Sequence, residues 1–199
     1  MLSKTKPLPD VITISGLAGT GKSTVAKLLA KKIKYQRINS GDIARNLAKE
    51  AKRDLITFCN QNLHDSKIDT LIDKKTLEHA KQKHVLLEAR LSGWMLYKHK
   101  IPALKIWLQA PLKVRAMRTM RREKSSLASS MRHIRQRDTL VIKAYKKHYG
   151  IDLNNTSIYD VVIDSTHMTP KQIVDFILSS YQALNFLLIS DGHSSIRFS

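Results

Sequence analysis

The stretch ITISGLAGTGKSTVAKLLAKKI, from Ile12 to Ile33, constrains the fold of this 199-residue chain more than any other segment. Apolar-leaning residues come first, followed by three glycines, a lysine and two hydroxyl side chains, and then by apolar residues at helical spacing. Gly16, Gly19 and Gly21 allow tight turns with positive φ. Consecutive backbone N–H groups can then converge on one anion ahead of a helix N-terminus, which favours negative charge. The sequence therefore predicts a buried strand, an anion-binding loop and a helix, in this order.

The residues around these glycines indicate which anion the loop binds. The spacing G-x-x-x-x-G-K-S is the Walker A pattern, in which the lysine can reach β- and γ-phosphates and the next hydroxyl can bind Mg²⁺. Lys22 and Ser23 occupy these two positions. We therefore expect the tail of a nucleoside triphosphate to bind here together with Mg²⁺. The residues of this loop are Gly16, Leu17, Ala18, Gly19, Thr20, Gly21, Lys22, Ser23 and Thr24.

Strand-like runs alternate with helical patterns along the chain. Strands are predicted at residues 11–15, 35–39, 85–88, 104–108 and 159–164. Helices are predicted at residues 21–34, 42–51, 55–62, 68–81, 111–123, 125–148 and 170–184. This alternation indicates an α/β fold with three layers, in which helices cover both faces of a five-stranded parallel sheet. We expect one domain over residues 1–184 and a poorly ordered tail over residues 185–199.

Polar side chains follow several of the predicted strands, at the edge where parallel sheets bind ligands. Ser40 and Asp42 come directly after the second strand, and Arg45 lies on the helix that follows. Glu88 ends the apolar run VLLE, so its carboxylate can hold a water on Mg²⁺ opposite the loop serine. Arg90 follows two residues later, and two arginines from different elements suit an anionic acceptor. Either arginine alone could equally be an ordinary surface residue.

The chain carries a formal net charge of +19, which implies anionic partners. Between Lys98 and Lys147 there are fifteen Lys and Arg residues against two acids, a net charge of +13. On the predicted helix at 111–123, three arginines recur at helical spacing, and three more follow on the next helix. These six residues are Arg115, Arg118, Arg122, Arg132, Arg135 and Arg137. Cations of this kind stabilise a phosphoryl group in transfer, although a solvated basic face or a nucleic-acid patch is the alternative.

Few other features restrict where this protein acts. The only cysteine is Cys59, so no disulfide can form within the chain, and Cys59 fits a helical apolar pattern as a small core residue. The N-terminal residues contain no apolar run typical of a signal peptide. No apolar run approaches the length of a membrane span. We therefore expect a cytoplasmic protein without a membrane partner.

Seven segments of the chain, taken in order, resemble the short archaeal-type cytidylate kinases. These segments are ITISGLAGTGKST, SGDIARNLA, IDTLIDKKTLEHA, VLLEARLSGW, IPALKIWLQAPLKVRAMR, YGIDLNNTSIYDVVID and TPKQIVDFIL. The resemblance implies the fold of P-loop nucleoside monophosphate kinases, with a core, a monophosphate-binding helical region and a mobile helical lid at about residues 121–149. It also implies transfer of the ATP γ-phosphate to CMP or dCMP with Mg²⁺ as cofactor. We expect the protein to act as a monomer.

The resemblance assigns roles to individual positions. Ser40, Asp42, Arg45 and Arg90 match the residues that bind the acceptor, while Ser23 and Glu88 match those that hold the metal. The catalytic residues that it implies are Lys22, Arg118, Arg122, Arg135 and Arg137. Two alternatives remain open: an adenylate-kinase-like NTPase that binds RNA or assists ribosome assembly, and a degenerate paralogue that binds nucleotide with little chemistry. A kinase with this charge could also bind nucleic acid weakly through its basic lid.

Overall fold

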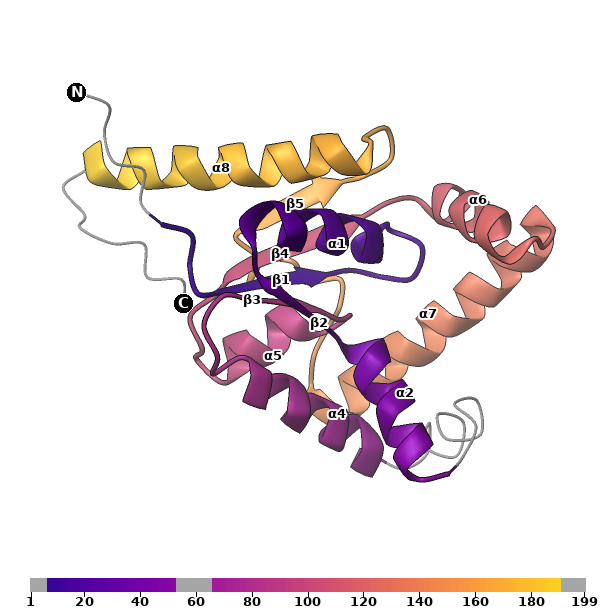
Figure 1. Ribbon diagram of the computed structural model, residues 1–199. Coiled ribbons are helices and arrows are strands. Elements are labelled where there is room, and N and C mark those ends of the chain that lie inside the picture. Colours follow the sequence, from indigo (N-terminus) through magenta and orange to yellow (C-terminus); the bar gives the residue numbers. More distant parts are fainter. Residues whose placement is uncertain (1–6, 53–65, 191–199) are drawn as a thin grey trace.

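The computed structural model describes residues 7–52 and 66–190, and its five strands form one parallel sheet (Figure 1). The strands are β1 (Val11–Ser15), β2 (Gln36–Asn39), β3 (Val85–Glu88), β4 (Leu104–Gln109) and β5 (Val161–Asp164). The helices in the described residues are α1 (Lys22–Ile33), α2 (Ser40–Glu50), α4 (Ser66–His79), α5 (Ser92–Lys98), α6 (Leu112–Glu123), α7 (Leu127–Tyr149) and α8 (Pro170–Ser190). The predicted α/β architecture with a five-stranded parallel sheet is confirmed. The helix predicted at 55–62, with Cys59, and residues 191–199 lie outside the described residues.

The strand order β2-β3-β1-β4-β5 places β1 at the centre of the sheet. Ile14 of β1 is in register with Glu88 of β3, which is also in register with Asn39 of β2. On the other side, Ser15 of β1 is in register with Trp107 of β4. Because all strands run in one direction, their carboxyl ends share one edge of the sheet. The loop after β1, the start of α2 and Glu88 therefore meet at this edge.

Helices cover both faces of the sheet. On one face, α1 and α8 lie side by side over a core that includes Ile12, Ile14 and Leu86 (Figure 1). On the other face, α4, α5 and the last turns of α7 pack over a core that includes Leu87 and Trp107 (Figure 1). Alternate residues of a strand point to opposite faces, so neighbours on β3 belong to different core clusters. The result is a three-layer arrangement whose ligand edge is approached by α2, α6 and α7.

Helix α5 is absent from the sequence-based prediction. It has only seven residues, SGWMLYK, which are too few for a periodic apolar pattern to stand out. It also contains Gly93, a poor helix former that this packing requires. A Cβ at Gly93 would lie 2.4 Å from the ring of Tyr159. Close packing against Tyr159, which is distant in the sequence, therefore requires glycine at position 93 although glycine has a low helix propensity.

Helix α8 is longer than predicted. It continues to Ser190 instead of ending at residue 184, so residues 185–190 of the expected tail are helical. The sequence between 185 and 190 contains neither glycine nor proline, and the first such residue is Gly192. No local signal therefore ends the helix at 184. Among the described helices, none is long and apolar enough to cross a bilayer.

Candidate active site

The loop between β1 and α1 has the backbone conformation that its glycines predict. Gly16, Gly19 and Gly21 have φ angles of 144°, 81° and 95°. A Cβ on Gly16 would lie 2.2 Å from the carbonyl oxygen of Leu108, and one on Gly19 would lie 2.8 Å from that of Arg115. The loop thus packs closely against β4 and α6, which only glycine permits at these positions. The N-terminus of α1 that follows has no side-chain cap, as is typical of an anion-binding helix start.

Lys22, the first residue of α1, lies among other cations. Its Nζ donates to the carbonyl oxygen of Leu17 at 2.7 Å. Burial and the nearby Arg90 lower the pKa of Lys22 to about 7, with a smaller opposing effect of Glu88 and a further lowering by Arg137. A bound anion would relieve this repulsion and favour the charged form of the lysine. The site is therefore built to receive negative charge.

Ser23, Glu88 and Arg37 form a chain of contacts at the edge of the sheet. Ser23 Oγ donates to Glu88 Oε1. Arg37 of β2 donates from Nε to Glu88 Oε2 at 2.8 Å, and a second guanidinium nitrogen lies 2.7 Å from the same oxygen. Glu88 is only 3% exposed, so Arg37 supplies the counter-charge that its carboxylate needs. A hydroxyl and a carboxylate side by side are oxygen ligands that suit Mg²⁺, so these residues fit the expected metal.

A cavity of about 240 Å³ lies between α2, α4, α7 and the loop after β3. Its polar and charged lining residues are Ser40, Arg45, Asp73, Arg90, Arg137 and Tyr145, and its apolar ones include Ala44, Ile72 and Leu91. Arg90 and Arg137 come from different elements, and the pKa of Arg137 is lowered mainly by the positive charge of Arg90. We call this space the acceptor-side cavity. It brings Ser40, Arg45 and Arg90 together, as the sequence predicts.

Asp42 is placed differently from the other residues expected at this cavity. Its carboxylate accepts a hydrogen bond from Arg45, which lies one turn later on α2. Its backbone N–H donates to the side chain of Asn39, the N-cap residue of α2, at 3.1 Å. Asp42 does not line the cavity itself. It therefore orients Arg45 in the free protein.

A second cavity of about 360 Å³, the donor-side cavity, lies on the other side of the loop, where α1, α6 and the start of α8 meet. Its lining includes Gly19, Gly21, Thr24, Arg118, Arg122, Met168, Pro170 and Ile173. Arg118 donates to Ser165 Oγ at 3.0 Å and to the carbonyl oxygen of Thr20 at 3.3 Å. It therefore connects the glycine-rich loop to the segment after β5. Arg122 is exposed and pairs with its neighbour Glu123 at 2.6 Å.

The arginines expected in the lid do not converge on one point. Arg118 and Arg122 line the donor-side cavity, whereas Arg137 lines the acceptor-side cavity. Arg135 is exposed and lines neither of them. Successive residues of an α-helix are about 100° apart, so Arg135 and Arg137 point about 200° apart on α7. The structure therefore brings Arg137 to the site but directs Arg135 to another side of the helix.

Arg115 has a structural position at the junction of the loop, α6 and α7. Its side chain forms a buried ion pair with Asp138 of α7, at 2.7 Å. The same guanidinium donates to the carbonyl oxygen of Ala18 in the glycine-rich loop at 3.1 Å. One arginine thus fixes the middle of α7 to the loop. Asp138 is one of the two acids in the basic segment, and this pair accounts for its presence there.

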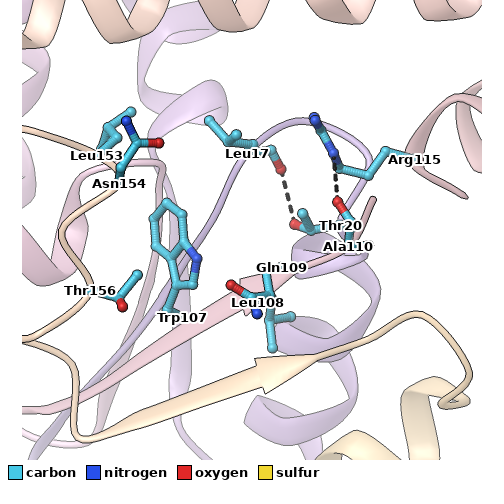
Figure 2. Close-up of a pocket in the computed structure, with 10 residues that line it drawn as sticks. All are labelled: Leu17, Thr20, Trp107, Leu108, Gln109, Ala110, Arg115, Leu153, Asn154 and Thr156. Carbon is cyan, nitrogen blue, oxygen red and sulfur yellow. Dashed lines mark hydrogen bonds between the residues drawn. The ribbon is translucent and has the colours of Figure 1, made fainter. Parts of the chain in front are cut away.

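Figure 2 shows a third cavity, of about 190 Å³, behind the glycine-rich loop. Trp107 of β4, Leu17 of the loop and Leu153 form part of its wall, together with Asn154 and Thr156 from the segment after α7. Hydrogen bonds from Thr20 to the Leu17 carbonyl, at 2.9 Å, and from Arg115 to the Ala110 carbonyl, at 3.0 Å, border it. Of the residues of the glycine-rich loop, Leu17 and Thr20 line this cavity.

Sequence reasoning missed several residues of the site. Arg37 contacts Glu88, Asp138 holds Arg115, and Asp73 and Tyr145 line the acceptor-side cavity. Arg37 lies in the short strand QRIN, and no local pattern indicates that this strand pairs with β3. The only usable signal was for Asp138, an isolated acid among many cations. The other contacts depend on tertiary packing between segments far apart in the sequence.

Comparison with known proteins identifies a family whose sequences are similar to this chain. A model of the cytidylate kinase-like family matches residues 11–167. The cytidylate kinase of Methanocaldococcus jannaschii is 40% identical over 175 residues, which cover 87% of this chain and 98% of that protein. The cytidylate kinase of Pyrococcus abyssi is 38% identical over 174 residues, covering 87% of this chain and 94% of that protein.

Solved structures share the fold at low sequence identity. A gluconokinase from Sinorhizobium meliloti has a TM-score of 0.62 and 15% identity, covering 94% of this chain and 100% of the gluconokinase. A shikimate kinase from Acinetobacter baumannii has a TM-score of 0.55 and 17% identity, covering 92% of this chain and 94% of the shikimate kinase. These likenesses concern the fold alone, which is that of P-loop kinases.

Proposed function

This chain belongs to the cytidylate kinase-like family, and on that premise we propose that it transfers the γ-phosphate of ATP to CMP or dCMP. The products are CDP or dCDP and ADP. The observation that carries this proposal is that the glycine-rich loop and the acceptor-side cavity approach each other around Lys22, Arg90 and Arg137. Two phosphates that meet there would be surrounded by cations from three elements.

We propose that ATP binds with its phosphates in the loop from Gly16 to Thr24. Lys22 and the N-terminus of α1 hold the β- and γ-phosphates, since both carry positive charge toward the loop. The donor nucleoside extends into the donor-side cavity, where Arg118 offers a flat guanidinium and Met168 and Pro170 offer apolar surface. The tether of Arg118 to Ser165 supports this role, because it holds the guanidinium beside the loop.

The acceptor nucleotide occupies the acceptor-side cavity in this proposal. Arg45 and Arg90 bind its phosphate, since a guanidinium can bind two phosphate oxygens at once. Ser40 and Asp42 support this end of the cavity, the first from the wall and the second through Arg45. The carboxylate of Asp73 lies in the same wall and can accept hydrogen bonds from an exocyclic amino group, which cytosine has and uracil lacks.

The chemistry that we propose is positioning combined with electrostatic stabilisation, without a covalent intermediate. Ser23 and Glu88 would hold Mg²⁺, which neutralises charge on the β- and γ-phosphates when bound. Arg137 lies next to Arg90, so it can stabilise the phosphoryl group that passes between the two nucleotides. Arg122 approaches from α6, and closure of α6 and α7 excludes water that would hydrolyse ATP. Arg135 is left out of this catalytic set because of its direction on α7.

The proposal extends to the oligomeric state of the protein and to the place where it acts. We propose that the protein acts as a monomer. The proposed substrates are nucleotides of the cytoplasm, and we propose that the protein acts there. The rival hypothesis of a ribosome-assembly NTPase gains no support from the relatives described above, which are cytidylate kinases. The intact glycine-rich loop argues against a degenerate paralogue.

The test is formation of each nucleoside diphosphate from ATP, Mg²⁺ and CMP, dCMP, AMP, GMP or UMP, measured by chromatography of the products. We expect kcat/KM for CMP and dCMP to exceed that for the other acceptors at least about tenfold, because a site that pairs with a base edge leaves polar groups unpaired with the wrong base. The Lys22→Ala protein serves as the control for contaminating kinases. A preference for AMP would refute CMP and dCMP as the acceptors. No transfer to any of the five monophosphates would refute the proposed kinase activity.

A further inference from the structure

Helix α7 separates its cations into two groups. Six of its side chains are Lys or Arg, and one, Arg137, faces the acceptor-side cavity. At 100° per residue, the other five lie within about 60° of a single direction on the opposite side of the helix. These five residues, which we call the outer stripe, are Arg132, Arg135, Lys143, Lys146 and Lys147.

The outer stripe has no acidic partner in the described part of the chain. All five side chains are exposed, and none takes part in an ion pair between described residues. The single acid of α7, Asp138, points elsewhere and pairs with Arg115. Like charges three and four residues apart on a helix repel each other. Within residues 7–52 and 66–190, the stripe therefore has no counter-charge.

The dimensions of the stripe suit a chain of phosphates. From Arg132 to Lys147 it extends about 22 Å along the helix axis, at 1.5 Å per residue. A single triphosphate is too short to contact cations over this length. A nucleic-acid strand carries one phosphate about every 3.4 Å in duplex form, so several of its phosphates can face the stripe at once.

Other polyanionic partners fit the stripe less well. A helix that binds anionic membranes inserts an apolar face, but the apolar side of α7 packs against α6 and the core. The only large apolar side chain of α7 with high exposure is Leu140, at 51%. Aromatic residues, on which unpaired bases stack, are also absent from the stripe. The contact would be made with the backbone and would not read base sequence.

We propose that the outer stripe of α7 is a binding surface for the sugar–phosphate backbone of nucleic acid. This surface is separate from the proposed site of phosphoryl transfer and does not depend on it. The observation behind the proposal is that five exposed cations of one helix share a direction and have no ion-pair partner among the described residues. One of them, Arg135, is a residue that the sequence had predicted in the active site.

A charge-matched pair of variants tests this proposal. One triple variant changes Lys143, Lys146 and Lys147 to Gln, and the control triple variant changes Lys27, Lys81 and Lys83 to Gln. All six lysines are exposed, and both variants lose three positive charges. Binding of a fluorescently labelled 20-nucleotide oligouridylate is measured by anisotropy between about 50 and 200 mM salt. Formation of CDP by each variant reports that its fold and its cleft are intact.

We expect the stripe variant to flatten the slope of log K against log salt by about two, since each lost contact with a single strand contributes about 0.7. The control variant should keep the slope of the unchanged protein. Equal losses in both variants would show a non-specific effect of net charge and overturn the proposal. So would the absence of binding to oligouridylate, or binding to anionic phospholipid vesicles instead with the same lysine dependence.

A second measurement does not depend on variants. Lysines of the unchanged protein are acetylated with a water-soluble ester, with and without oligouridylate, and the modified peptides are quantified by mass spectrometry. We expect Lys143, Lys146 and Lys147 to be protected at least about threefold more than Lys27, Lys81 and Lys83. Equal protection of the two sets would contradict the assignment of the surface to α7.

Discussion

Lys22 shows how a single residue of the site depends on its ligand. In the free protein its pKa is about 7, because burial and the charges of Arg90, Arg137 and Arg115 outweigh the effect of Glu88. In the unfolded chain the same group has its ordinary pKa of about 10.4. Bound phosphates would restore the charged form. ATP binding is therefore linked to proton uptake by this lysine.

We predict that Lys22 takes up close to one proton when ATP binds at pH 8. At pH 6, ATP binding should cause almost no proton uptake at this residue. At pH 8 the lysine of the free protein is mostly neutral, and at pH 6 it is already charged. Calorimetry in two buffers of different ionisation enthalpy measures this uptake. The Lys22→Ala protein should bind ATP more weakly, without this uptake. The same uptake in Lys22→Ala would assign it to another group.

The same pKa shift has a consequence for stability. Because the folded-state pKa of Lys22 is lowered, the unfolded chain binds one more proton between about pH 7 and pH 10.4. The contribution of Lys22 to stability therefore rises with pH across this window, and its full cost is present below pH 7. Lys22→Ala should raise Tm relative to the unchanged protein at pH 6 and lose this advantage toward pH 10. A pH-independent difference in Tm would contradict the shifted pKa.

At the residue scale, sequence alone predicted the strand ends better than the contacts between them. Ser23 and Glu88 are in contact, as predicted. Their positions were predictable because the loop pattern places the serine and the strand-end rule places the glutamate. Arg37 was not predictable, since its role depends on β2 lying next to β3. Arg135 and Arg137 look equivalent as neighbours in sequence, yet helix geometry separates them by about 200°. Such contacts require the register of helices against the sheet, which a single sequence does not contain.

At the element scale, helix α7 has two halves with different packing. Its C-terminal half contributes Val141, Ile142, Tyr145 and Tyr149 to the core on one face of the sheet. The hydroxyl of Tyr149 donates to Asp73 of α4, and the ammonium of Lys98 donates to the Tyr149 carbonyl. Its N-terminal half lies against α6, away from the sheet (Figure 1), and buries only Ser130 and Ile134. The ion pair of Arg115 and Asp138 lies between the two halves.

This division predicts which part of the expected lid, residues 121–149, moves. Residues 121–135 should exchange amide hydrogens fastest in the free protein, because few buried contacts hold them. A bisubstrate analogue that joins adenosine and cytidine through phosphates should protect them, since it neutralises Arg122 and Arg137. Residues 141–149 should be protected in both states. Hydrogen exchange with mass spectrometry measures this, and equal protection of residues 121–135 with and without the analogue would contradict closure.

The elements themselves were largely predictable from periodicity. Long helices such as α6 and α7 and buried strands such as β1 and β3 carry clear patterns, and their bounds agree closely with the prediction. Helix α5 was missed because it has only two turns. The end of α8 was missed because the apolar residues before Ser190 contain no stop signal. Short length and the low helix propensity of Gly93 explain the first difference, and the missing stop signal explains the second.

At the scale of the whole molecule, the strand order positions the site. With β1 at the centre and β3 beside it, the glycine-rich loop, Glu88 and Arg90 share one edge of the sheet. Helices α6 and α7 extend beyond that edge and return across it toward α4 (Figure 1). The net charge of +19 exceeds what two nucleotides require, and α7 divides its share between the cleft and the outer stripe. Helix α7 therefore carries two sets of cations that point in different directions.

We propose that phosphoryl transfer occurs where the glycine-rich loop and the acceptor-side cavity meet, with Arg137 and not Arg135 contributing from α7. The most direct test is the rate of CDP formation from ATP and CMP by Arg137→Ala and by Arg135→Ala, a matched pair on one helix. We expect kcat to fall about 100-fold or more in Arg137→Ala, because a cation beside the transferring group is lost, and to stay within about threefold of the unchanged protein in Arg135→Ala. A loss in Arg135→Ala as large as that in Arg137→Ala, or full activity of Arg137→Ala, would contradict it.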